Sequence, residues 1–297
     1  MSQWLSEKER GALWTIRFMS RLCSRRYRWL AELLLYPVVG YFFLTAGRRL
    51  QASRHFFERA SGHFSAIDHY RQLMCFARSL LDRIAILSGG AAHFQINSNG
   101  REQLVEAQRR GKGVILLGSH LGNFEASKAL IKDRADINVH VVAYFGGSQK
   151  IRNVLDELQP ELATQVIDPT EADAVFHMRD VIEAGGILAI LGDRTGFGER
   201  TLQVDFLGEP AQLPAGPYFL AAALHCPVYC FFGMRVGTGR YDTYMVKLAD
   251  RIRLTRGQRA EQAQVYAQRF ADLLADKARN YPYNWFNFYE FWNAPDS

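Results

Sequence analysis

The fold class of this chain follows from one segment, Gly113-Val114-Ile115-Leu116-Leu117-Gly118-Ser119-His120-Leu121-Gly122-Asn123-Phe124-Glu125. Its apolar run has the length of a buried strand and ends at Gly118 and Ser119, and a helical pattern follows over residues 124–131. A strand, a glycine-containing turn and a helix in this order are typical of α/β folds. His120 is therefore expected at the carboxyl end of a strand, where open α/β sheets bind their ligands.

His120 and Glu125 form a candidate catalytic pair across this turn. Gly122 allows the backbone to bend back, so the carboxylate can orient one imidazole nitrogen while the other faces a cleft. A histidine oriented in this way is a competent general base for a hydroxyl group. The alternative is purely structural: His120 caps the helix, and Glu125 is an acidic residue in the first turn, favoured by the helix dipole.

Residues 119–125, Ser119-His120-Leu121-Gly122-Asn123-Phe124-Glu125, resemble the His-x4-Asp/Glu motif of the lysophospholipid acyltransferase superfamily. In the form His-x-Gly-Asn-aromatic-Glu they are similar to the bacterial lipid A biosynthesis acyltransferases, the lauroyl and myristoyl transferases. A second block resembles that family's Asp-containing turn and the segment after it: Leu191-Gly192-Asp193-Arg194, then Val204-Asp205-Phe206-Leu207-Gly208-Glu209-Pro210-Ala211-Gln212-Leu213-Pro214-Ala215-Gly216-Pro217.

This resemblance implies a glycerolipid acyltransferase-like α/β fold with a mostly parallel central sheet flanked by helices. It implies transfer of a fatty acyl chain from a thioester, on acyl carrier protein or coenzyme A as co-substrate, to a hydroxyl group of a lipid or glycolipid. His120 would be the base and Glu125 its orienting carboxylate, with no acyl-enzyme, no metal and no cofactor. The substrate-binding residues expected are Asn123, Arg152, Asp193, Arg194, Phe206 and Gly216. Backbone amides around Gly122 and Asn123, or a nearby basic side chain, would stabilise the oxyanion.

Several alternatives stay open at this point. The acceptor is open between a lipid A precursor, a lysophospholipid and another glycolipid, and an amide-forming transferase is a further variant. A hydrolase that uses the same pair to activate water, in effect a thioesterase, is another reading. From a different class, the chain is a non-catalytic, membrane-associated lipid-binding relative. For Asp193 and Arg194 the structural alternative is a turn with a local ion pair. For Arg152 it is an ordinary charged side chain on the solvent-exposed face of a helix.

The positive charge of the chain is concentrated at its N-terminus. The net charge is +6, whereas residues 1–60 alone contain eleven Lys/Arg and four Asp/Glu. No base-stacking or groove-reading motif accompanies this charge, so nucleic acid is not expected as a partner. An anionic membrane surface or an acidic carrier protein fits better.

The N-terminal third predicts membrane association. Residues 7–22 have the pattern of an amphipathic helix, and the uncharged run 33–47, with Pro37 in its middle, is shorter than the ~20 residues of a bilayer-spanning helix. We therefore expect a peripheral or monotopic protein at the cytoplasmic face of the inner membrane. The alternative for this run is a pair of core helices. Residues 1–90 are expected to form a helical, membrane-associating and acyl-chain-binding region, and residues 91–297 the α/β domain, in one continuous unit.

The remaining patterns alternate between strands and helices. Helices are predicted over 52–88, 101–110, 172–184, 214–224 and 256–279, with another around Arg152; a turn is predicted at 97–100. Strands are predicted over 139–145, 164–168, 187–191, 227–232 and 243–248. Asp193 and His120 would both follow strands and share one mouth of the sheet. The aromatic segment 281–292 is expected to pack on the domain, and the four cysteines to be free thiols.

Overall fold

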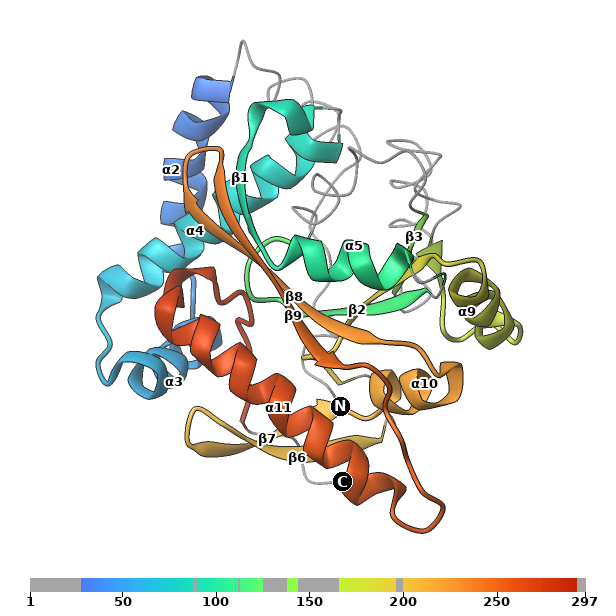
Figure 1. Ribbon diagram of the computed structural model, residues 1–297. Helices are drawn as coiled ribbons and strands as arrows, with labels where there is room; N and C mark the ends of the chain where they lie inside the picture. The colour runs from blue at the N-terminus through green and yellow to red at the C-terminus, as the bar shows by residue number, and fades with distance from the viewer. Residues whose placement is uncertain are drawn as a thin grey trace.

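The computed structural model describes residues 28–87, 90–109, 111, 113–124, 138–143, 166–195 and 200–292. Its centre is a seven-stranded sheet of order β1-β9-β8-β2-β5-β3-β4, beside which lies a two-stranded hairpin, β6-β7 (Figure 1). The strands are β1 Gln95–Asn99, β2 Val114–Gly118, β3 Val139–Val142, β4 Val166–Ile167, β5 Ile187–Leu191, β6 Thr201–Phe206, β7 Glu209–Pro214, β8 Val228–Gly237 and β9 Arg240–Ala249.

Five neighbouring strands of the sheet, β8, β2, β5, β3 and β4, run parallel to one another. β9 is antiparallel to β8, and β1 pairs parallel with β9 at the edge, so these two strands run in the opposite direction. The prediction of a mostly parallel sheet in an α/β fold is therefore confirmed. β2 lies inside the sheet between β5 and β8, which explains why its apolar run is uninterrupted.

Helices cover the sheet and one of its edges (Figure 1). Their bounds are α2 Arg28–Leu44, α3 Arg48–Ser61, α4 Ala66–Leu87, α5 Arg101–Arg109, α9 Ala174–Glu183, α10 Gly216–Leu224 and α11 Arg259–Asn280. Short 3-10 turns, η2 Gly90–His93 and η3 Pro282–Asn284, complete the described elements. The helices predicted at 101–110, 172–184, 214–224 and 256–279 are thus present, with ends shifted by a few residues.

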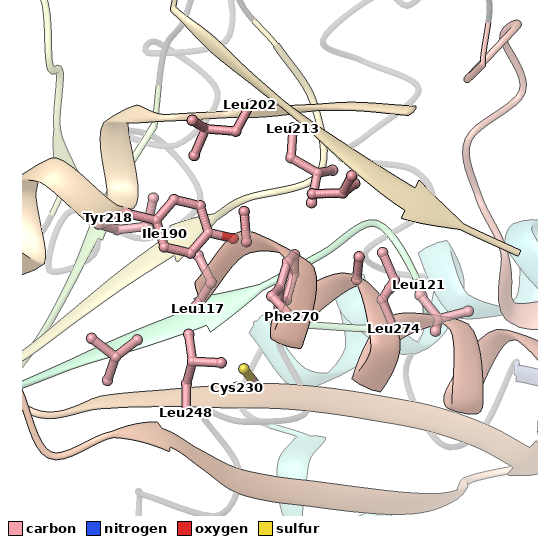
Figure 2. Packing of buried hydrophobic residues seen from close by; sticks show 14 of the residues in the cluster. Leu117, Leu121, Ile190, Leu202, Leu213, Tyr218, Cys230, Leu248, Phe270 and Leu274 are labelled. Atoms are coloured by element: carbon pink, nitrogen blue, oxygen red, sulfur yellow. The ribbon is translucent and has the colours of Figure 1, made fainter. Parts of the chain in front are cut away.

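Alternate residues of β2 face two different cores, as the period of two in a strand requires. Ile115 and Leu117 pack into the larger cluster with α10, α11 and the β6-β7 hairpin. Val114 and Leu116 pack on the other face with Leu104 of α5. Figure 2 shows Leu117 in the larger cluster, near Tyr218 of α10 and Phe270 of α11. Side chains on both faces of β2 are buried, so the strand lies in the interior of the protein.

The helices α2 and α3 meet at a sharp bend of 93°. Ala31, Leu35 and Val39 of α2 are buried in one cluster with residues of α4, while the opposite side of α2 is exposed and apolar. Its exposed residues include Trp29, Leu33, Leu34, Tyr36, Val38, Tyr41, Phe42 and Leu44. Within the described residues no single helix is long and apolar enough to cross a membrane, although the bent pair α2 and α3 is, by length and composition alone.

One prediction of local structure is wrong and another is refined. Residues 97–100 were expected as a turn, but residues 97–99 belong to the edge strand β1 and Gly100 alone turns, with φ of +83°. Pairing with β9 overrides the weak strand preference of asparagine, and Asn97 and Asn99 donate to Asp242 and to the Thr243 carbonyl. The helical pattern expected over 52–88 is confirmed, and it consists of α3 and α4, separated after Ser61 by Gly62 in the left-handed conformation.

Some predictions lie outside the described residues: the helices at 7–22, 124–131 and around Arg152, and the end of the strand predicted to reach 145. The boundary at residue 90 also stays a prediction. Phe56 and Phe57 of α3 belong to the same buried cluster as the sheet residues. Cys226 and Cys230 are buried free thiols, as predicted, and Cys75 is a partly buried one.

Candidate active site

The register between β2 and β5 brings His120 and Asp193 together. These two parallel neighbours pair Gly118 with Leu191, and the Gly192 amide donates to the Gly118 carbonyl at 2.9 Å. His120 and Asp193 each stand two residues beyond that last pair. They therefore leave the sheet at the same height on adjacent strands, which confirms that both lie at one mouth of the sheet.

Asp193 holds His120 through two hydrogen bonds. The backbone N–H of His120 donates to Asp193 Oδ2 at 2.8 Å, and Nδ1 lies 2.9 Å from Oδ1. Because an ionised carboxylate only accepts, Nδ1 carries the proton and Nε2 is the unprotonated nitrogen. Among the described residues none hydrogen-bonds Nε2, and the imidazole side chain is 26% exposed. The imidazole is thus oriented with its basic nitrogen available.

Burial and charge set the protonation of this pair. Burial by itself raises the pKa of Asp193, but the nearby His120 and Arg194 and the Asn287 amide outweigh it and lower the pKa to about 2. Burial also lowers the pKa of His120 below its usual 6.5; Asp193 opposes this shift and Arg194 adds to it. At neutral pH the carboxylate is therefore ionised and the imidazole neutral, the state that a general base requires.

The C-terminal segment forms one wall of the site. Trp285 bridges to Leu121, the Phe286 amide donates to the His120 carbonyl at 3.1 Å, and Asn287 Nδ2 donates to Asp193 Oδ2 at 2.8 Å. Arg194 Nε donates to Asn287 Oδ1 at 2.8 Å, and its guanidinium lies over the ring of Tyr289. The tail packs on the domain as predicted, and in addition it fixes the carboxylate that holds His120.

The N-terminal helices position Trp285, which is 1% exposed. Phe56 of α3 stacks on its ring at 5.0 Å with an interplanar angle of 7°. Gln72 of α4 donates to its carbonyl at 2.6 Å, and Ser53 Oγ donates in turn to Gln72 Oε1. Two helices outside the sheet therefore support the segment that pairs with the His120 turn.

Gly122 allows the closest backbone approach in the site. Its φ is +81°, and a Cβ there would lie 2.3 Å from the Gly233 carbonyl oxygen. The Gly122 amide donates to the Asn284 carbonyl and the Asn123 amide to the Gly233 carbonyl, each at 2.8 Å. Both amides are therefore already used within the fold. The basic side chain that the sequence offered as the alternative oxyanion donor stays a prediction.

The remaining predicted residues fall in different places. Asn123 is buried, and its Nδ2 donates to Tyr241 at 3.4 Å. Phe206, also buried, stacks on Trp285 and Trp292. Gly216 is exposed at the first position of α10. Glu125 and Arg152 lie outside the described residues, so the roles assigned to them stay predictions.

Sequence reasoning missed the partner of His120 and the role of the tail. Asp193 was assigned to substrate binding, whereas it contacts the imidazole directly. A signal for the tail was present: Asn284 and Asn287 are polar residues inside a strongly aromatic run, and both prove to be buried and hydrogen-bonded to neighbouring segments. A buried amide needs partners, so its place in such a run points to a specific contact.

Comparison with protein families agrees with this geometry. Residues 72–294, about three quarters of the chain, match the model of the bacterial lipid A biosynthesis acyltransferases. The chain belongs to this family. The matched range begins in α4 and includes His120, Asp193 and the C-terminal wall with Asn287. Membership implies an acyltransferase with a lipid acceptor. No curated protein matches the sequence significantly.

Proposed function

We propose that this member of the lipid A acyltransferase family moves a fatty acyl chain from a thioester to a hydroxyl group of a lipid or glycolipid, with His120 Nε2 as general base. The observation that carries the proposal is the bond between His120 Nδ1 and Asp193 Oδ1, at 2.9 Å, beside a neutral imidazole. A buried carboxylate on Nδ1 both selects the required tautomer and stabilises the imidazolium that forms during the reaction.

The reaction proceeds by direct transfer. Nε2 takes the proton of the acceptor hydroxyl while its oxygen attacks the thioester carbonyl, and a tetrahedral oxyanion forms. The carbon–sulfur bond then breaks, and the imidazolium returns its proton to the leaving thiolate. Among the described residues Cys226 and Cys230 are buried, and burial raises the pKa of Cys226 to about 11. Such thiols are poor nucleophiles, which favours a ternary complex without an acyl-enzyme.

Asp193 takes the orienting role in this proposal, because it already accepts from Nδ1. Glu125 keeps its assignment to the reaction through the His-x4-Glu resemblance alone. Arg152 is the basic side chain that the same resemblance offers for the oxyanion or the acceptor. Variants of these two residues test those roles separately from Asp193.

The proposed site of action is the cytoplasmic face of the inner membrane, with the protein bound as a peripheral or monotopic one. The exposed apolar side of α2 supports this, since Leu33 is 56% and Leu44 83% exposed in a helix whose opposite side is buried. Arg48 and Arg49 begin α3, which three intervening residues separate from the end of α2, and suit an anionic headgroup layer. The donor is proposed to be acyl carrier protein, with coenzyme A as the other carrier of the same thioester.

An assay of purified protein in mixed micelles tests the proposal. Acyl carrier protein or coenzyme A thioesters are supplied with a lipid A precursor or a lysophospholipid, and acylated lipid and free fatty acid are both measured by mass spectrometry. We expect acylated lipid from the wild type and none from His120→Ala. Release of free fatty acid alone would make the protein a thioesterase. Equal transfer by the wild type and His120→Ala would refute the role of His120.

A further inference from the structure

A second cleft, of about 500 Å³, opens between α2, α4, the end of β8 and the segment around η3. Three arginines line it: Arg71 and Arg78 from α4, and Arg235 from β8. The other polar lining comes mainly from tyrosine and asparagine side chains. Among the described residues that line it, none is an aspartate or a glutamate. This size and charge suit a small anionic group.

Two of these arginines have buried nitrogens that need an acceptor. The Arg235 side chain is 7% exposed, and its Nε donates to Asp82 at 3.0 Å. Its Nη2 is buried, as is Nε of Arg78, and within the described part of the chain neither atom has a hydrogen-bond partner. A buried donor left unpaired costs about 1–3 kcal/mol. Both residues also line the cleft, so an anion bound there would lie beside two guanidinium groups and offset their charge.

The acidic groups near the cleft are already engaged. Asp82 is fully buried and pairs with both Arg28 and Arg235, while Glu32 pairs with Arg28. Asp68 accepts from the backbone N–H and the hydroxyl of Ser65 and from Tyr283, to which Arg71 also donates. Among the described residues no acid forms an ion pair with Arg78, whose Nη2 donates to the Tyr36 hydroxyl at 3.5 Å. Of the three lining arginines, Arg235 is therefore the one that forms an ion pair within the described residues.

The cleft lies between the apolar face of α2 and the candidate active site. Tyr36 of α2 lines it and is half exposed beside the apolar residues Leu33 and Leu34. Asn284 lines it as well, and the Asn284 carbonyl accepts from Gly122 in the His120 turn. A phosphate bound here would thus sit next to the surface proposed to face the lipid.

We propose that this cleft binds the phosphate of a lipid headgroup, with Arg78 and Arg235 as its principal ligands. Guanidinium groups bind phosphate through paired, charge-assisted hydrogen bonds, and tyrosine hydroxyls add neutral donors. The proposal that a phosphate binds here is argued only from the residues that line the cleft. Its assignment to a lipid, rather than to free phosphate, rests on the proposed membrane function.

Calorimetric titration of the full chain tests the site, with inorganic phosphate and with dihexanoyl phosphatidic acid below its micelle concentration. Arg78→Gln is the test variant because Arg78 takes no part in the buried Asp82 network. Arg251→Gln is the matched control, since Arg251 lies in a separate basic cleft with Arg253 and Arg259. We expect Arg78→Gln to weaken binding about tenfold or more and Arg251→Gln to leave it unchanged.

The two ligands separate the possible sources of phosphate. Tighter binding of the short-chain lipid than of inorganic phosphate, lost in Arg78→Gln, supports a lipid headgroup. Equal affinities, both lost in Arg78→Gln, overturn the lipid assignment and leave a site for free phosphate. Binding that Arg78→Gln does not change overturns the site itself. His120→Ala should bind as the wild type does, so failure of the catalytic proposal would leave this result intact.

Discussion

The Asp193→Asn substitution tests the chemistry of the site most directly, because it keeps the size of the side chain and removes only its charge. Oδ2 accepts from the His120 amide and from Asn287 Nδ2, both at 2.8 Å. The carbonyl oxygen of the new amide satisfies these two donors only if its NH2 group replaces Oδ1. That NH2 group faces Nδ1 of His120, which must then accept, so the imidazole proton moves to Nε2.

The size of the effect follows from two contributions. The reversed amide orientation, which would keep Nε2 free, leaves two buried donors unpaired at about 1 kcal/mol or more each, so the wrong tautomer is favoured by about 2 kcal/mol. Loss of the carboxylate also removes stabilisation of the imidazolium, on the order of 2–4 kcal/mol at an effective dielectric of 20. At 1.36 kcal/mol per factor of ten, kcat should fall about 10³- to 10⁴-fold.

The assay is steady-state acyl transfer by the wild type and by Asp193→Asn, with thermal unfolding and circular dichroism as checks on the fold. We expect KM to change little, because Asp193 acts through His120 rather than on the substrate. The residual activity should rise with pH through a lower midpoint than in the wild type, since the carboxylate raises the pKa of His120. A folded variant with kcat within tenfold of the wild type would refute the assignment of Nε2 as base.

Three further substitutions test the rest of the structure. Gly122→Ala should lower the free energy of unfolding, measured in urea, more than Gly208→Ala does. Both glycines have positive φ, but a Cβ at Gly122 would lie 2.3 Å from the Gly233 carbonyl oxygen, whereas a Cβ at Gly208 would meet no atom within 4 Å. Equal losses of stability would contradict this packing. His69 is buried with its pKa lowered, chiefly by burial, to about 4. His69 therefore binds a proton near pH 6.5 in the unfolded chain but stays neutral in the folded chain at that pH. The free energy of unfolding should fall by about 1–2 kcal/mol from pH 7 to pH 5. In His69→Asn, which keeps a donor toward Ser53, that fall should disappear; its persistence would show that another group is responsible. Leu33→Glu should reduce co-flotation with anionic vesicles while thermal unfolding stays unchanged, and undiminished flotation would argue against membrane contact through α2.

The local pattern of the sequence was sufficient for most elements. The run Ile187–Leu191 is apolar throughout and is strand β5 with the predicted bounds. The amphipathic pattern over 256–279 predicted a long helix, and α11 spans most of that range. Such patterns predict elements correctly because burial of one face of a helix, or of both faces of an inner strand, produces a recognisable spacing of apolar residues in the sequence. Residues 97–100 failed because their strand depends on pairing with β9.

The α/β class, the position of His120 after a central strand and the family could all be predicted from the order of residues. The identity of the carboxylate that holds the imidazole depends on the three-dimensional fold. His120 and Asp193 are 73 residues apart, and they meet because β2 and β5 are neighbours in register. Asn287, which holds Asp193, and the Arg235 cleft likewise depend on segments that are distant in the chain. Periodicity reports which residues are buried, whereas hydrogen-bond partners depend on strand order and register, which short-range patterns do not encode.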